Sequence, residues 1–420
     1  MIHFENALLI DPEAGTAEPG SLTLDAGRIA ARDEPAPKGA EVIDCGGKVL
    51  APGLVDWGVK VGEPGERHKE SYRTAGAAAA AGGVTTMIVR PDTAPPIDSP
   101  ESLDFVTKRA ADAVVRVHHM AALTKAREGR EMVEIGFLAD AGAVAFTDGV
   151  RVVADTRLLG RCLTYARGCG ALIVGHPQDP GLSRGAAATA GKFASLYGIA
   201  HVSPMAELMG LERDLAMIRM TGARYHADQI TTAAALEPLR RAREDGLDVT
   251  AGVSIHHLTL NEFDVGDYRT FFRFTPPLRA ETDREAVVQA VADGEIDVIA
   301  SFHTPQDEES KRLPFSEAAP GAVGLQTLLP AALRLYHQGG LSLPQLWRAM
   351  SLNPSRILGL EGGRLSVGAP GDLVLLDPDA PFVLDRFALL SKSKNTPFDG
   401  ARMQGRVLGT WVGGRAVFRA

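Results

Sequence analysis

Cysteines, long apolar runs and clusters of basic residues are all scarce in this sequence. Three cysteines occur in 420 residues, Cys45, Cys162 and Cys169, and they lack the paired spacing of a zinc site. Such few, odd-numbered cysteines are typical of reduced thiols in a cytoplasmic protein, which argues against a disulfide scaffold. No apolar run reaches the roughly 18 residues that a membrane-spanning helix needs, so no spanning segment is predicted.

The charge is spread over both signs, and no stretch is strongly basic. The chain has 44 Lys and Arg against 52 Asp and Glu, a net charge of −8. This balance argues against nucleic acid or an anionic membrane as the main partner. Residues 1–6 lack the basic and apolar segments of a signal peptide. With 45% hydrophobic and 23% charged residues, the composition is that of an ordinary soluble globular protein.

Both ends of the chain are expected to form short strands joined by turns. The expected strands are residues 8–12, 21–24, 28–30, 42–44, 372–377 and 405–412. Neither end has enough apolar residues to fold alone, so we predict one small composite β-sandwich domain from residues 1–51 and 362–420. A chain of this length also predicts a large domain, which residues 52–361 would form.

The middle of the chain alternates between short apolar runs and helical stretches such as residues 71–81 and 282–292. Such apolar runs are typical of buried parallel strands. Eight occur, at residues 54–61, 84–90, 114–123, 143–147, 171–174, 223–231, 248–255 and 296–301. Eight strand–helix units predict an α/β fold, a (β/α)8 TIM barrel whose chemistry lies at the C-terminal strand ends. A doubly wound open sheet is the alternative, and no glycine-rich phosphate loop is present.

Several motifs along the chain point to one family. The most specific are residues 293–300 and residues 391–400, which read SKSKNTPFDG. Others lie at residues 52–65, 82–86, 91–98, 143–148, 249–252, 256–258 and 276–279. Over nearly the whole chain these resemble the dihydroorotases of multifunctional-complex type, in the cyclic amidohydrolase superfamily. The resemblance implies an amidohydrolase barrel and a place in de novo pyrimidine synthesis, where the family closes carbamoyl aspartate into dihydroorotate.

The resemblance also implies a catalytic zinc, which the family binds partly through two histidines on the first barrel strand. Here those positions are Gly58 and Lys60, and residues 54–63 contain no histidine. Glycine has no ligand atom, and a protonated lysine has no free lone pair and repels a cation. These two positions of the first strand therefore offer nothing to a metal ion.

The other metal and proton-transfer positions of the family lie at the tips of strands four, five, six and eight. Asp148 and His176 match the ligands on strands four and five. Gln229 stands where the family has the histidine of strand six, and Phe302 where it has the proton-transferring aspartate of strand eight. A catalytic zinc site usually needs three protein ligands, and loss of a general base alone costs roughly two to four orders of magnitude in rate.

The positions that hold the substrate in the family are changed as well. Its arginine is Gly62, its asparagine is Asp92, and the last histidine of its strand-eight motif is Gln306. An aspartate repels the carboxylate that such a site must hold. We therefore expect no catalytic, substrate-binding or metal-binding residue at these positions, and no cofactor.

A relocated metal site is the alternative, and it would make the chain an active dihydroorotase or another cyclic amidohydrolase with zinc. The side chains available for it are Asp148, His176, His226 and His303. Within the pairs His118–His119 and His256–His257 the two side chains cannot bind one ion together, because adjacent strand residues point to opposite faces. We expect them to be hydrogen-bonded histidines of the core or loops.

The positive charge of Lys60 suggests a structural role for this residue. Its ammonium group would occupy the space of the missing metal and neutralise Asp148, which stabilises the fold without restoring activity. The alternative is that the lysine extends to water.

The resemblance implies a partner. In the multifunctional-complex branch of the family, dihydroorotase-like chains assemble with aspartate carbamoyltransferase, and non-catalytic members serve as its scaffolds. We therefore predict a non-catalytic dihydroorotase homologue in a homo- or hetero-oligomer that supports this transferase. A small-molecule sensor is a third possibility, with Trp57 and Phe302 lining the old pocket.

Overall fold

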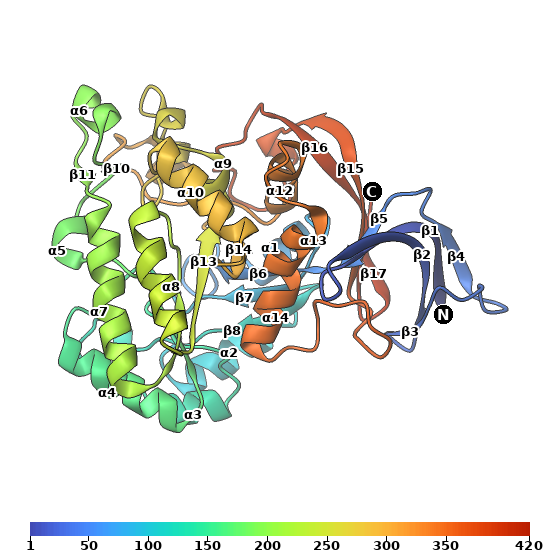
Figure 1. The fold of residues 1–420 in the computed structure, drawn as a ribbon, viewed down its shortest axis with the longest axis horizontal. Coiled ribbons are helices and arrows are strands. Elements are labelled where there is room, and N and C mark those ends of the chain that lie inside the picture. The colour runs from blue at the N-terminus through green and yellow to red at the C-terminus, as the bar shows by residue number, and fades with distance from the viewer.

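The computed structural model describes residues 1–420 and consists of a barrel beside a sheet that contains both termini (Figure 1). The sheet has eight strands in the order β17-β16-β15-β5-β1-β2-β3, with β4 paired to β1. Their bounds are β1 (Ile2–Asp11), β2 (Thr16–Asp25), β3 (Arg28–Arg32), β4 (Glu41–Asp44), β5 (Val49–Pro52), β15 (Leu373–Val383), β16 (Arg402–Val412) and β17 (Arg415–Arg419). The expected composite sheet from the two ends of the chain is present.

The terminal sheet encloses a core of its own. Strand β1 pairs in parallel with β4 through residues 2–5 and with β5 through residues 8–9, so it changes partner part-way along its length. The core consists of 13 buried residues, among them Phe4, Leu24 and Trp411. The rings of Phe4 and Trp411 meet edge to face, with centroids 4.9 Å apart. Such aromatic pairs stabilise a small core beyond the area they bury.

The barrel is built from parallel strands in two hydrogen-bonded groups, β6-β7-β8 and β9-β12-β13-β14. Their bounds are β6 (Leu54–Val59), β7 (Val84–Val89), β8 (Arg116–His119), β9 (Leu172–Gly175), β12 (Arg224–Ala227), β13 (Val249–Ser254) and β14 (Val298–Ala300). Phe146 links the groups, because it bridges in parallel to both Ala121 and Ile173. The predicted strand at residues 143–147 is therefore present only as these two bridges of Phe146.

The ring closes between its last and first strands. The Ser301 amide donates to Asp56 Oδ1 at 2.7 Å, and the Lys60 amide donates to the His303 carbonyl at 2.8 Å. The predicted TIM barrel is therefore confirmed. Its interior is filled by ten buried residues, most of them from the strands: Val55, Trp57, Ile88, Met120, Ala145, Leu172, Val174, Val298, Ala300 and Phe302.

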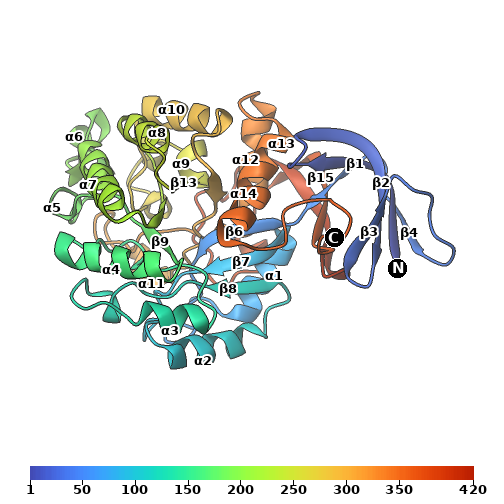
Figure 2. The ribbon, with the colours of Figure 1, turned by 60° about the horizontal axis from the view of Figure 1, so that its bottom comes forward.

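Helices cover the outside of the barrel (Figure 2). Their bounds are α1 (Tyr72–Ala81), α2 (Pro100–Ala110), α3 (Ile135–Asp140), α4 (Thr156–Gly168), α5 (Pro180–Ser183), α6 (Lys192–Tyr197), α7 (Met205–Thr221), α8 (Leu236–Glu244), α9 (Ile255–Thr259), α10 (Glu281–Ala292), α11 (Glu308–Arg312), α12 (Leu328–His337), α13 (Leu343–Trp347) and α14 (Asn353–Leu358). The pair β10 (Ala188–Thr189) and β11 (His201–Val202) lies outside the barrel. No helix is both long and apolar enough to cross a membrane.

Helix α1 shows how the sequence determines where a helix begins and why it continues. Ser71 caps its N-terminus through a reciprocal pair of hydrogen bonds with Thr74, and a run of alanines, which favour helix, follows. The helix lies against β16 of the terminal sheet, where the Thr410 hydroxyl donates to the Ala80 carbonyl at 2.7 Å. The predicted helices 71–81 and 282–292 are present as α1 and α10.

Candidate functional site

Strand β6 delivers Gly58 to the mouth of the barrel, which is the side where the strands end. Gly58 has a φ of +74°, and a Cβ built on it would lie 2.8 Å from Cδ1 and Cε1 of the Phe302 ring. Real Cβ atoms do not approach other atoms this closely. The phenyl ring that stands at the strand-eight aspartate position therefore fills the space that a side chain at position 58 would need.

Lys60 lies just beyond β6 and is held by carboxylates of nearby loops. Its Nζ is 2.8 Å from Glu66 Oε2 and 4.0 Å from Asp92 Oδ2. The hypothesis that it neutralises Asp148 is wrong, since the two form no ion pair. The Asp148 carboxylate instead accepts hydrogen bonds from the Leu123 and Thr124 amides, each at 3.0 Å. Lys60 nevertheless serves as an internal cation, for other partners than expected.

Replacing Lys60 with methionine is expected to lower the free energy of unfolding by about 1–2 kcal/mol, because a mostly buried ammonium group leaves two carboxylates. Glu66 keeps Lys69, whose Nζ is 2.5 Å from Oε1, so the loss is partial. Urea unfolding at neutral pH measures the change. The control is Lys125→Met, which removes an exposed pair with Glu131 and should have no measurable effect. Equal effects of the two substitutions would contradict the assignment.

The two retained family residues, Asp148 and His176, are both buried. Burial raises the pKa of Asp148, partly offset by hydrogen bonds from Thr124 and Leu123. Burial also lowers the pKa of His176 to about 4, with Arg279 and Arg90 adding to the shift. The His176 ring is therefore neutral at physiological pH, and its Nδ1 has no hydrogen-bond partner.

The remaining histidines of the proposed relocated site face other groups. His226 points into the barrel, where its Nδ1 is 2.8 Å from Thr250 Oγ1 and its ring lies against Trp57, centroids 4.5 Å apart. His303 accepts from the Gly324 amide through Nδ1 at 3.1 Å. Gln229, next to the end of β12, takes a φ of +107°.

A metal ion finds no ligand set among these side chains. No three His, Cys, Asp or Glu side chains lie close enough together to hold one. The relocated set of Asp148, His176, His226 and His303 is therefore not brought together. Since a catalytic zinc usually needs three protein ligands, the residues present do not fit the zinc that the resemblance implies.

The substrate-anchoring positions are engaged by the protein itself. Gly62 lies in a tight turn, where its carbonyl accepts from the Glu66 amide at 2.6 Å and a Cβ would lie 2.3 Å from the Glu66 carbonyl oxygen. The Gln306 side chain donates to the Pro320 carbonyl at 2.9 Å. Asp92 pairs with Arg90 at 3.3 Å. Burial raises the pKa of Asp92, but Arg90, Lys60 and Arg127 outweigh it and hold the pKa below its ordinary value.

The degenerate site consists of Gly58, Lys60, Asp148, His176, Gln229 and Phe302. Part of it lines a cavity of about 180 Å³ together with Arg90, Asp92 and Gln306. Ligand sites usually enclose about 300–1,000 Å³, so this remnant is small for a substrate.

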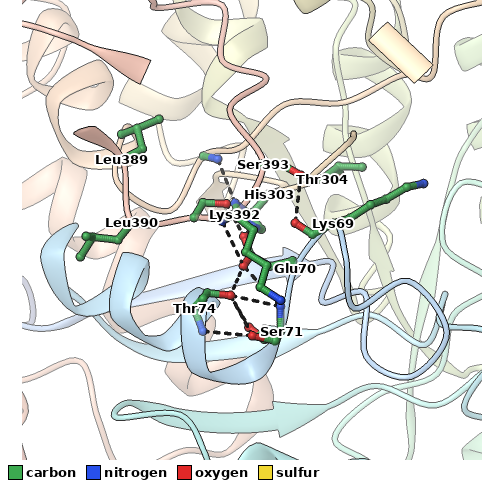
Figure 3. Close-up of polar contacts among 12 residues, drawn as sticks. Lys69, Glu70, Ser71, Thr74, His303, Thr304, Leu389, Leu390, Lys392 and Ser393 are labelled. Carbon is green, nitrogen blue, oxygen red and sulfur yellow. Dashed lines mark hydrogen bonds and ion pairs between the residues drawn. The ribbon is translucent and has the colours of Figure 1, made fainter. Parts of the chain in front are cut away.

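One buried residue of the mouth, Glu70, has no role in the sequence predictions. It lies before α1 and accepts a hydrogen bond from the hydroxyl of Thr74 (Figure 3). It also accepts one from the hydroxyl of Ser391. Its Oε2 is also 3.5 Å from His303 Nε2. Glu70 thus joins the first barrel loop, the end of the last strand and the motif at residues 391–400. Sequence alone shows these segments but not that they meet.

The same motif is tied to the end of the last strand through Asn395. Its Nδ2 donates to the carbonyls of Thr304 and Gly321 at 3.1 and 3.0 Å, and its Oδ1 accepts from the Gln306 amide at 3.1 Å. These contacts fasten the motif, and with it the C-terminal segment, onto the barrel mouth.

The pair His256–His257 lies in α9 and not in a strand, so the argument from opposite strand faces does not apply to it. The change of structure occurs at Ser254, whose hydroxyl accepts from the His256 amide as the cap of α9. The two rings still serve different partners. His256 Nδ1 is 3.1 Å from Ser254 Oγ, and His257 Nε2 is 3.1 Å from the Pro276 carbonyl. Both histidines are buried, and each is hydrogen-bonded through one ring nitrogen, while Nε2 of His256 and Nδ1 of His257 have no partner.

His256 makes stability depend on pH. Burial lowers its pKa from 6.5 to about 3, with smaller contributions from His257 and His303. The unfolded chain therefore binds the extra proton first, and this group's stabilisation is complete above pH 6.5 and lost as the pH falls toward 3. The advantage of wild type over His256→Gln should shrink by roughly 2 kcal/mol between about pH 7.5 and about pH 5.

Urea unfolding at the two pH values measures this change. The exposed His201→Gln variant controls for the loss of one imidazole. A constant difference between wild type and His256→Gln would show that His256 does not titrate in this way.

Comparison with known proteins shows which family the chain belongs to. A family model described as dihydro-orotase-like matches residues 47–235. The dihydroorotase of Anaplasma phagocytophilum is 37% identical over 100% of this chain and 95% of its own length. The chain belongs to the dihydroorotase family. The dihydroorotase of Desulforapulum autotrophicum is 36% identical over 100% of this chain and 99% of its own length.

Solved structures agree with this family fold. The L-hydantoinase of Arthrobacter aurescens superposes with a TM-score of 0.89 at 24% identity, covering 100% of this chain and 96% of that one. A dihydropyrimidinase from Brevibacillus agri gives 0.86 at 20% identity, covering 100% and 95%. At this level of identity the likeness shows the fold alone. This member of the dihydroorotase family therefore has the amidohydrolase barrel that its sequence predicted.

Proposed function

We propose that this dihydroorotase homologue is non-catalytic and acts as a structural partner of aspartate carbamoyltransferase in pyrimidine biosynthesis. The observation that carries the first half is the contact between Gly58 and Phe302. Position 58 has no ligand atom, and position 302 has no carboxylate. The ring of Phe302 fills the space that a side chain at position 58 would need.

The chemistry of the family explains why these losses matter together. Opening or closing a cyclic amide calls for a metal that polarises the carbonyl, a carboxylate that moves the proton, and groups that hold the substrate carboxylate. In this chain the ligands do not converge, Phe302 cannot carry a proton, and Asp92 places a negative charge where the substrate anchor would be.

A scaffold role needs a stable fold, and contacts within the barrel mouth contribute to that stability. Loops of the barrel mouth are joined by internal pairs, Lys60 with Glu66 and Glu70 with Ser391. Buried groups satisfied by protein partners fix a single arrangement of the loops. Membership of the dihydroorotase family supports the choice of transferase as partner, because the resemblance that identified the family implies such assemblies.

Co-expression with the aspartate carbamoyltransferase of the same organism tests the partnership. We expect the two chains to co-purify at a fixed ratio, and we expect transferase activity or its thermal stability to fall when this chain is omitted. The matched control is an unrelated TIM-barrel protein expressed at the same level. A chain that elutes as a monomer, beside a transferase with unchanged activity, would contradict the proposal.

A further inference from the structure

Next to the degenerate site lies a second and larger cavity, of about 650 Å³. Its walls come from loops that follow the third, fourth, fifth and seventh barrel strands, and His176 lies among them. The charged side chains that line it are Arg127, Arg130, Arg151, Arg184, Arg273 and Glu128. We call this cavity the arginine pocket. Its volume is within the usual range of about 300–1,000 Å³ for small-molecule sites.

Most arginines of the arginine pocket have no carboxylate in direct contact, although Asp92 and Asp148 attract Arg127 from a greater distance. Arg130 lies 3.7 Å from Glu128, but the other four arginines form no ion pair. Arg127 donates to the Asp148 carbonyl at 2.8 and 3.1 Å, and Arg151 donates to the Arg127 carbonyl at 3.2 Å. The pocket therefore gathers unpaired cations in a chain whose net charge is −8.

Arg273 makes the imbalance costly. Its side chain is buried, with 7% of the residue exposed, and it has no carboxylate partner. Nη1 donates to the Phe274 carbonyl at 2.8 Å, but Nε has no partner. A buried charge without a counter-charge is destabilising, and an anionic ligand would remove that cost.

We propose that the arginine pocket binds a small molecule bearing a phosphate group. Guanidinium groups present planar pairs of donors that match phosphate oxygens, and one phosphate can accept from several of them at once, whereas a carboxylate is filled by one or two. The free Nδ1 of His176 adds a further polar atom to the wall. This site goes beyond the scaffold role and stands whether or not the chain contacts the transferase.

Calorimetric titration of the full chain with inorganic pyrophosphate tests the site. Inorganic phosphate and citrate serve as parallel probes, which separate a diphosphate from a single phosphate and from a polycarboxylate. The test variant is Arg151→Gln with Arg184→Gln, both exposed and free of ion pairs, so it should fold normally. The control is Arg157→Gln with Arg161→Gln on α4, which makes the same charge change outside the pocket.

We expect pyrophosphate to bind with a dissociation constant on the order of 1 mM or tighter, weakening with added salt. The test variant should bind at least about tenfold more weakly, while the control variant binds like wild type. Tighter binding of inorganic phosphate than of pyrophosphate would still support the site and would assign it to a single phosphate. Citrate binding in preference to both phosphates, no phosphate binding, or equal binding by wild type and the test variant would overturn the proposal.

Discussion

Replacing Gly58 with alanine is expected to lower the free energy of unfolding by about 2–4 kcal/mol, although it adds a single methyl group. About 1 kcal/mol comes from a φ of +74°, which a residue with a Cβ adopts only under strain. The rest comes from overpacking, because the new methyl group would lie 2.8 Å from the Phe302 ring. Chemical denaturation of the purified variant measures the loss.

The control for backbone strain is Gly246→Ala, where φ is +78° and nothing lies within 4 Å of the new Cβ. It should cost only about 1 kcal/mol.

A double-mutant cycle of Gly58 and Phe302 then isolates the contact between them. Phe302→Ala alone should cost about 3–5 kcal/mol through the cavity it leaves, and the double variant with Gly58→Ala should lose at least about 1 kcal/mol less than the two single losses added together. Strict additivity would show that the two residues do not share that space.

Replacing Glu207 with glutamine is expected to destabilise the protein by about 3–5 kcal/mol. Glu207 and Arg279 form an ion pair at 3.2 Å with 0% and 1% of their side chains exposed. The carboxylate also accepts from the Thr231 and Thr232 amides at 2.8 and 2.9 Å. Removing its charge leaves the Arg279 guanidinium buried without compensation, which is the costly way to break a buried pair.

Urea unfolding compares this variant with Glu212→Gln on the same helix, α7. Glu212 pairs with Arg241 at 2.7 Å on the surface, with about half of each side chain exposed. That control should be indistinguishable from wild type, because exposed pairs contribute little. The Glu207 carboxylate also holds the backbone of Thr231 and Thr232, which lie close to Gln229. The Glu207 variant should therefore open more often in this segment and become more susceptible to proteolysis near residue 229. Equal stability of the two variants would contradict a structural role for the buried pair.

The architecture was accessible from the sequence because it follows from local pattern. Apolar runs of strand length, separated by helical stretches, predicted the barrel, and strand-rich ends predicted the terminal sheet. The least regular strand, at residues 143–147, is reduced to the bridges of Phe146. The resemblance covered nearly the whole chain and indicated the family correctly, because it rested on several separate motifs, residues 391–400 among them.

The contacts within the site were not accessible, because they depend on how distant loops meet. Gly58 and Phe302 were each recognised as a lost function, but not as neighbours that fill one another's space. Lys60 was assigned to Asp148 because both stand at family positions, whereas the turn at Gly62 brings Glu66 back to the lysine. Glu70 was not singled out, since two of its contacts, with His303 and Ser391, come from distant parts of the chain.

Elemental analysis of the isolated protein, paired with a dihydroorotate turnover assay after incubation with zinc, tests the central claim most directly. The account predicts no stoichiometric metal and no turnover above the uncatalysed background, since only Asp148 and His176 remain of the ligand set and no three ligand side chains converge. One zinc bound per chain, together with conversion of dihydroorotate, would contradict it.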